Sequence, residues 1–193
     1  MEIGTSRIGR ALAATGVIVD GVRADQWALP TPCADWSVRT LVNHLVGGLR
    51  IFSALIEDRP VLDHDGTDWL GDDPRAAYRS AAAADARAWS RAGVGDLTFA
   101  LAVGDVPGPL ATTIHLTEIV VHGVDLAVAT GQEAAVDEEL AAELLATMRA
   151  TGIDAFRQPG IFGPEVPAQA GEPAHRSLLH YLGRSPQHAS IAV

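Results

Sequence analysis

Lysine is absent from the 193-residue chain, and its 14 basic residues, all arginines, are outnumbered by 24 acidic ones. The formal net charge is -10. Nucleic acids and anionic lipid surfaces are bound through cationic protein faces, so this charge balance argues against both as partners. A small-molecule substrate is the expected partner, and the composition leaves a homodimer open.

Cysteine is nearly absent as well, since Cys33 is the single one. One thiol forms no internal disulfide and no multi-thiolate zinc site, which favours a reducing compartment. The sequence also lacks a run of the roughly 20 apolar residues that a membrane span needs. Beside Glu2, the N-terminus has no continuous apolar segment of the signal-peptide kind. We therefore expect a cytoplasmic protein.

A chain of 193 residues, 48% of them hydrophobic, is long enough for one well-buried domain and too short for two full-sized ones. Residues 1–193 are therefore expected to form a single domain. The spacing of apolar residues predicts an all-α fold. The predicted helices span about 3–23, 37–57, 74–92, 110–129 and 137–150, followed by a short helix over 174–182.

The remaining segments are predicted to be irregular. Prolines and two tryptophans indicate an ordered loop over 26–36, six aspartates indicate a solvated loop over 58–73, and proline and glycine interrupt 158–173. The apolar run Phe99–Val103 fits either a short strand or a packed extended loop.

Two of the predicted helices carry polar residues among apolar ones. Glu118 and His122 are four positions apart, so their side chains project from successive turns of one helix face. The neighbours of Glu118 are apolar, and a buried carboxylate needs a cationic partner. His44 lies in the helix over 37–57, just before Gly47, whose missing side chain lets a ligand come close.

Two imidazoles and one carboxylate form a three-ligand set that leaves coordination positions of a metal ion open, as in catalytic sites. His44, Glu118 and His122 are therefore the candidate metal ligands. The alternatives are an exposed ion pair between Glu118 and His122, and a packed core histidine at position 44.

Other polar residues have two interpretations each. His115 is a general base or alternative ligand, or it packs at the pocket rim. Asp125 orients a ligand imidazole, or it makes an ordinary contact near the helix end. Arg39 and Arg50 bracket His44 and could receive the carboxylates of a thiol cofactor, or they are solvated charges.

Two residues in the predicted loop over 26–36 are interpreted as structural. Cys33 could be a nucleophile, but a buried structural thiol is the favoured interpretation because no histidine is nearby in sequence. Trp36 is favoured as a core plug under this loop rather than a substrate platform.

Three spaced stretches carry a family resemblance: Pro30–Arg39 with Leu41–Gly48, His115–Ala127 with Ala129–Gly131, and Leu182–Pro186. Together they resemble actinobacterial proteins similar to the N-terminal domain of mycothiol-dependent maleylpyruvate isomerase. The resemblance covers nearly the whole chain. It implies a DinB-like four-helix bundle with additional short C-terminal helices.

The resemblance also implies a divalent metal ion on residues matching His44, Glu118 and His122. Zinc is the usual ion, with nickel, manganese or iron as alternatives. It further implies mycothiol as cosubstrate, in isomerisation or in S-transfer to a small electrophile. Two rival functions are a metal-dependent hydrolase or tailoring lyase or cyclase that needs no thiol, and a non-catalytic small-molecule-binding module.

Overall fold

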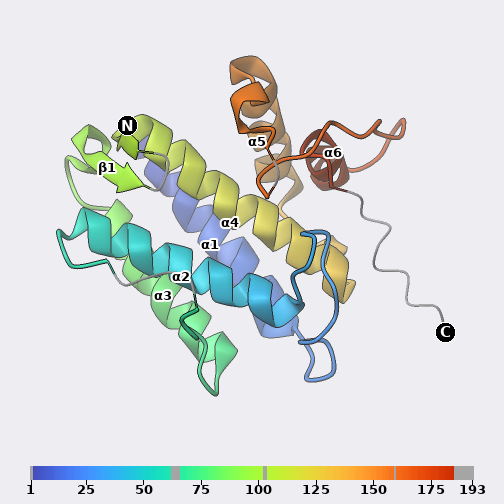
Figure 1. Ribbon diagram of the computed structural model, residues 1–193, viewed down its shortest axis with the longest axis horizontal. Coiled ribbons are helices and arrows are strands. Elements are labelled where there is room, and N and C mark those ends of the chain that lie inside the picture. Colours follow the sequence, from blue (N-terminus) through green and yellow to red (C-terminus); the bar gives the residue numbers. More distant parts are fainter. Residues whose placement is uncertain (1, 62–65, 102–103, 159, 185–193) are drawn as a thin grey trace.

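Four long helices run side by side as a bundle in the computed structural model of the protein (Figure 1). They are α1 (Glu2–Gly21), α2 (Val38–Ile56), α3 (Pro74–Trp89) and α4 (Gly108–Thr130). α4 packs against α1 and α2, and α3 closes the ring against the same two helices. The structure describes residues 2–61, 66–101, 104–158 and 160–184. The predicted all-α fold is confirmed, and the arrangement is consistent with a DinB-like bundle.

Local capping fixes several of the helix ends. Ser37 caps α2, where its hydroxyl accepts a hydrogen bond from the Thr40 N–H at 3.1 Å. Asp73 caps α3 in the same way, with proline in the first turn. α4 ends at Gly131, whose φ of 70° lies in the left-handed region that glycine adopts without a Cβ clash. These ends agree with the predicted ones to within about three residues.

α4 is the most buried element of the bundle. From His115 to Thr130 every residue except Glu118 is buried. A helix that is apolar on nearly all sides must be covered on all sides, and α1, α2 and the C-terminal helices contact it. The half-exposed Glu118 therefore marks the place where this part of α4 faces an opening.

The segment between α3 and α4 is a short hairpin. After a 3₁₀ turn, η1 (Val94–Asp96), strand β1 (Thr98–Leu101) pairs antiparallel with β2 (Gly104–Pro107). Of the predicted apolar run, residues 99–101 form strand, and Ala102 and Val103 lie outside the described residues. The Phe99 ring packs 5.6 Å from that of Trp89, which explains why an extended segment lies against the bundle.

The loop between α2 and α3 differs from its prediction. Leu62–Asp65 lie outside the described residues, but Trp69 and Leu70 are buried. The prediction of a solvated loop was wrong for these two residues because it rested on the aspartates of the segment. Asn43 on α2 anchors the loop, since its Oδ1 accepts from the Trp69 N–H at 2.7 Å.

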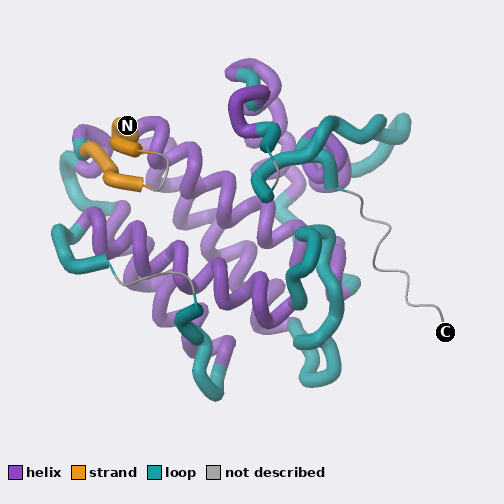
Figure 2. Tube along the Cα trace, viewed as in Figure 1, coloured by secondary structure: helices purple, strands orange, loops and turns teal. Residues whose placement is uncertain are grey.

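The C-terminal part lies beside the second half of α4 (Figure 1). It contains η2 (Glu133–Ala135), α5 (Glu138–Thr151), η3 (Asp154–Phe156) and α6 (Ala174–Tyr181). The loop between α1 and α2 folds against the end of α4 (Figure 2), where Gln26 Nε2 donates to Thr130 O at 2.9 Å. Among the described helices, none has the length and apolar character needed to cross a membrane.

Candidate metal site

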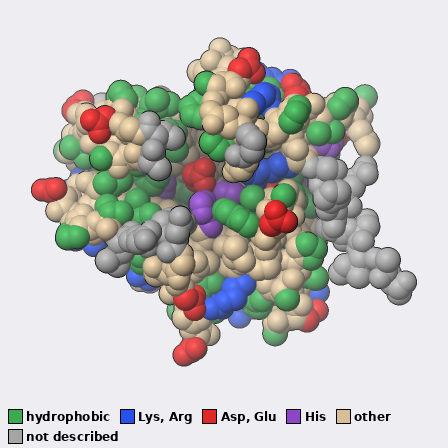
Figure 3. All heavy atoms as spheres, in the orientation of Figure 1, with side chains coloured by type: hydrophobic (Ala, Val, Ile, Leu, Met, Phe, Trp, Pro, Cys, Tyr) green, Lys and Arg blue, Asp and Glu red, His purple; other side chains and the backbone are tan. Residues whose placement is uncertain are grey.

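His44 on α2 and the pair Glu118 and His122 on α4 converge on one point. His44 Nε2 lies 3.1 Å from Glu118 Oε2, and His122 Nε2 lies 3.2 Å from the same oxygen. The ring centroids of the two histidines are 5.0 Å apart. Figure 3 shows histidine side chains gathered beside an acidic one in the middle of one face of the molecule.

The local sequence positions these three side chains. The four-residue spacing stacks Glu118 and His122 on one face of α4, and the Ser37 cap fixes where α2 begins and hence the direction in which His44 projects. Trp36, next to the cap, lies against both histidines, with ring centroids 4.6 Å from His44 and 5.5 Å from His122. Trp36 is partly buried against the hydrophobic core, as the core-plug interpretation expects, and the same indole also lies at the site.

Asp125 lies on the other side of the His122 ring. Its Oδ2 is 3.2 Å from His122 Nδ1, so a proton on Nδ1 donates to the carboxylate and Nε2 is directed toward Glu118. A carboxylate that holds the far nitrogen of an imidazole is a frequent feature of metal-binding histidines. The structure thus places Asp125 where the sequence hypothesis requires it.

The carboxylates and imidazoles of this group shift one another's pKa values. Burial would raise the pKa of Glu118, but the hydrogen bonds from His122 and His44 hold it well below its usual range. Burial would lower the pKa of His122, but the carboxylates of Asp125 and Glu118 raise it. With 42% of the Glu118 side chain and 30% of His44 exposed, the group is open to solvent on one side, whereas His122 is 6% exposed.

The donor atoms fit a divalent cation. One nitrogen or oxygen from each of His44, Glu118 and His122 lies within 4.8 Å of the others. Ligand atoms about 2.1 Å from a tetrahedral ion lie roughly 3.4 Å apart, close to the observed 3.1 and 3.2 Å. Three donors would leave the exposed side for a further ligand.

A second group of donor atoms shares His122. Cys33, His122 and Asp125 also offer ligand atoms within 4.8 Å of one another. Burial raises the pKa of the Cys33 thiol to about 11, so a cation would displace its proton at a greater cost in free energy than that of an ordinary thiol. Asp125 is moreover engaged with the Nδ1 side of His122. The first group is therefore the better cation site, although Cys33 lies nearer to it than the sequence indicated.

His115 does not join the group. Its side chain is 1% exposed, and its Nε2 lies 2.8 Å from Asp85 Oδ2 on α3, which is fully buried. The rings of Phe52 and Trp89 pack on it at 4.1 and 5.3 Å. This position is inside the bundle rather than at a pocket rim, so a role as base or ligand stays a prediction without support from contacts with the group.

Arg39 and Arg50 face away from His44. Both are about 120–140° around α2 from this histidine by helix geometry, and both contact the loop before α3. Arg39 Nη2 pairs with Asp68 at 3.0 Å, and Arg50 lies over the Trp69 ring at 5.5 Å. Their role in cofactor binding stays a prediction.

Arg184, which was not among the predicted site residues, contacts this group through Asp125. It follows α6, and its Nη1 contacts Asp125 Oδ2. The sequence showed it only as part of a closing motif, Leu182–Pro186, of which Ser185 and Pro186 lie outside the described residues. Nothing in local spacing indicates that this residue reaches α4.

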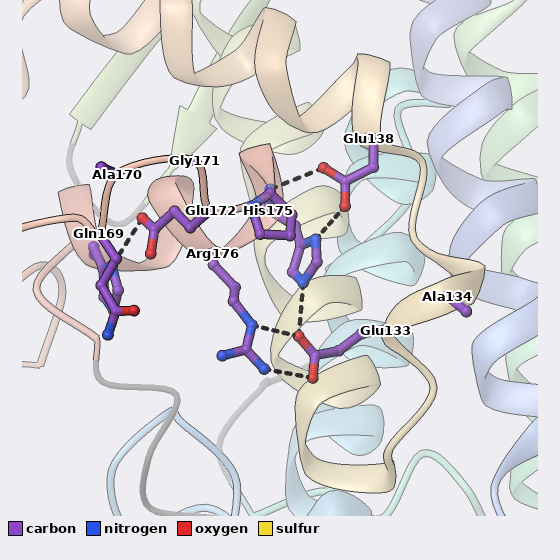
Figure 4. Close-up of a pocket in the computed structure, with 11 residues that line it drawn as sticks. Glu133, Ala134, Glu138, Gln169, Ala170, Gly171, Glu172, His175 and Arg176 are labelled. Carbon is purple, nitrogen blue, oxygen red and sulfur yellow. Dashed lines mark hydrogen bonds and ion pairs between the residues drawn. The ribbon is translucent and has the colours of Figure 1, made fainter.

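A cavity of about 680 Å³ lies elsewhere, between η2, α5 and α6 (Figure 4). His175 lies there between two carboxylates, in contact with Glu138 and 2.8 Å from Glu133. Arg176 makes a two-pronged ion pair with Glu133 at 2.7 and 2.8 Å. These charges satisfy one another, so we interpret the network as a connection between α6 and α5.

Comparison with known proteins agrees with the sequence resemblance. Residues 8–127 match the family model of the mycothiol maleylpyruvate isomerase N-terminal domain. Two Mycobacterium tuberculosis proteins, uncharacterized protein Rv0738 of strain H37Rv and uncharacterized protein MT0763 of strain CDC 1551, are each 37% identical over 181 residues. The alignment covers 91% of this chain and 94% of each relative. No solved structure matches the chain.

Proposed function

The chain belongs to the mycothiol maleylpyruvate isomerase N-terminal domain family, and we propose that it is a divalent-metal-dependent enzyme with a thiol cosubstrate. The cosubstrate would be mycothiol, and the reaction S-transfer to a small electrophile or its isomerisation. The convergence of His44, Glu118 and His122 within 4.8 Å supports the metal ion, and membership of the family supports the thiol cosubstrate.

Zinc is the favoured ion. Two imidazoles and a carboxylate suit zinc, and they also accept nickel, manganese or iron. A divalent cation at this position would lower the pKa of a coordinated thiol and so supply a nucleophile at neutral pH.

The chain's own residues prepare the site for such a cosubstrate. The Asp125 carboxylate directs Nε2 of His122 to the shared point. The partial exposure of Glu118 and His44 leaves an approach from solvent, and the Trp36 ring forms a wall on both histidines. The aromatic wall limits where a bound molecule can lie and keeps water from one side of the donors.

The test is a titration of cobalt-loaded protein with mycothiol, with S-methylated mycothiol as the matched control. The proposal expects a sulfur-to-cobalt charge-transfer absorption with the free thiol and none with the methylated form. Cobalt binding without a response to the thiol would contradict the thiol-dependent reaction and favour a hydrolase or a tailoring lyase or cyclase. A chain that binds no cation would point to a small-molecule-binding module.

A further inference from the structure

A largely buried arginine contacts the carboxylate next to the candidate metal ligand His122. Arg184 Nη1 contacts Asp125 Oδ2, with Arg184 11% exposed and Asp125 fully buried. Within the described ranges, Asp125 Oδ1 has no hydrogen-bond partner. A buried carboxylate without a cation beside it is costly, so Arg184 compensates a charge that α4 carries into the core.

One carboxylate oxygen of Asp125 contacts two side chains. Asp125 Oδ2 contacts Arg184 on one side and lies 3.2 Å from His122 Nδ1 on the other. His122 in turn directs Nε2 toward Glu118. A continuous series of charged contacts thus runs from the segment after α6 to the cation site between α2 and α4.

We propose that Arg184 is a positioning residue of the metal site: it holds the Asp125 carboxylate, which fixes the His122 imidazole with Nε2 facing Glu118. This inference rests on the proposed function, because the expected effect of Arg184 is on the affinity of the site for a metal ion. Arg184 lies outside residues 8–127, which match the family model. The C-terminal segment is therefore part of the site and not an appendage to the bundle.

The backbone holds Arg184 firmly in place. At the end of α6 the Arg184 N–H donates to Leu179 O at 2.9 Å and the Gly183 N–H to His180 O at 3.0 Å, the pattern of a Schellman cap. Gly183 has a φ of 76°, and a Cβ there would lie 2.5 Å from Gly163. The close crossing of these two glycines sets the direction in which the chain leaves α6.

The end of α6 is also anchored by burial. Leu178, Leu179 and Leu182 are fully buried, and Arg157 donates to the carbonyls of Gly163 and Tyr181. Arg157 therefore stabilises the same segment as Arg184 without a contact to Asp125. This difference supplies a matched control.

The experiment compares Arg184→Gln, Arg184→Lys and Arg157→Gln with the unaltered protein in cobalt titrations, and records the visible ligand-field bands and the melting temperature. Loss of a group that supports a metal ligand indirectly typically weakens metal affinity 10–100-fold. We expect a loss of that size in Arg184→Gln, with altered bands and partial rescue by lysine. Arg157→Gln should lower the melting temperature but bind cobalt like the unaltered protein.

Two results would overturn the inference. One is cobalt affinity in Arg184→Gln close to that of the unaltered protein. The other is an equal loss of affinity in Arg157→Gln, because Arg184 would then act only by packing its segment.

A failure of the proposed function can be told apart from a failure of this inference. If the unaltered protein binds no metal, the thermal unfolding of Arg184→Gln, His122→Gln and the double variant still tests whether Arg184 acts on His122. Non-additive shifts in melting temperature would support a positioning role through Asp125, and additive shifts would refute it.

Discussion

His44 Nε2 on α2 lies 3.1 Å from Glu118 Oε2 on α4, and this contact joins residues 74 positions apart in the chain. Because His122 Nε2 reaches the same oxygen, Glu118 is the centre of the donor group. It is also the one residue between His115 and Thr130 that is not buried. Its charge is therefore available to a cation.

The variant Glu118→Gln keeps the shape of the side chain and removes this charge. We expect metal affinity to fall by at least about 100-fold, more than for a residue that acts through a ligand. Competition with a chromophoric chelator measures it. Glu57→Gln, at the end of α2, is the control and should bind like the unaltered protein. Equal affinities in both variants would argue against Glu118 as a ligand.

Glu133 predicts a dependence of stability on acid pH. Hydrogen bonds from Arg176 lower the pKa of Glu133 to about 2; partial burial opposes the shift and His175 adds to it. In the unfolded chain a glutamate titrates near about 4.3. The ionised carboxylate therefore stabilises the fold fully above about pH 5, and this contribution is lost as the pH falls toward about 2.

Glu133→Gln should lower the free energy of unfolding at neutral pH by roughly 1–2 kcal/mol and flatten its decline in acid. Urea unfolding at several pH values measures both effects. The exposed Glu165→Gln is the control, because Glu165 meets Arg149 at a longer 3.4 Å. If the free energy of unfolding of Glu133→Gln declined in acid as it does in the unaltered protein, the ion pairs of Glu133 would contribute nothing to stability.

The thiol of Cys33 should be unreactive at neutral pH. Burial raises its pKa to about 11, and the charge of Arg184 only partly opposes this. Alkylation by iodoacetamide near neutral pH should be about 100-fold slower than in urea-unfolded protein, because the thiolate is the reactive form. Similar rates in folded and unfolded protein would contradict the structural interpretation of this residue.

His115 and Asp85 form a buried pair that we expect to serve stability. His115→Leu leaves the Asp85 carboxylate without its 2.8 Å partner and should cost roughly 3–5 kcal/mol of unfolding free energy. Replacing both residues by leucine should recover part of this loss, and metal content should stay unchanged in both variants. A stable His115→Leu protein that had lost its metal would instead support the sequence hypothesis of a ligand.

Much of the fold follows from local signals. Ser37 and Gly131 mark helix ends through hydrogen bonding and backbone conformation within a few residues, so they could be predicted directly. The pair Glu118 and His122 is likewise set by a four-residue spacing. That His44 meets this pair was inferred from residue types alone, and the structure brings the three together.

Other features depend on contacts between distant segments. Trp69 is buried within a loop rich in aspartate because Asn43 on α2 holds its backbone. Arg184 reaches Asp125 across 59 positions, and Trp36 packs on histidines from two helices. No spacing rule relates such residues, so only the folded arrangement shows these contacts and brings Arg184 and Trp36 to the site.

The metal site is tested most directly by the metal content of protein purified without chelator or affinity nickel, measured by elemental analysis beside a His44→Ala, His122→Ala double variant. We expect close to one equivalent of zinc or a similar divalent ion in the unaltered protein and none in the variant. No metal in either, or equal metal in both, would contradict the site built from His44, Glu118 and His122.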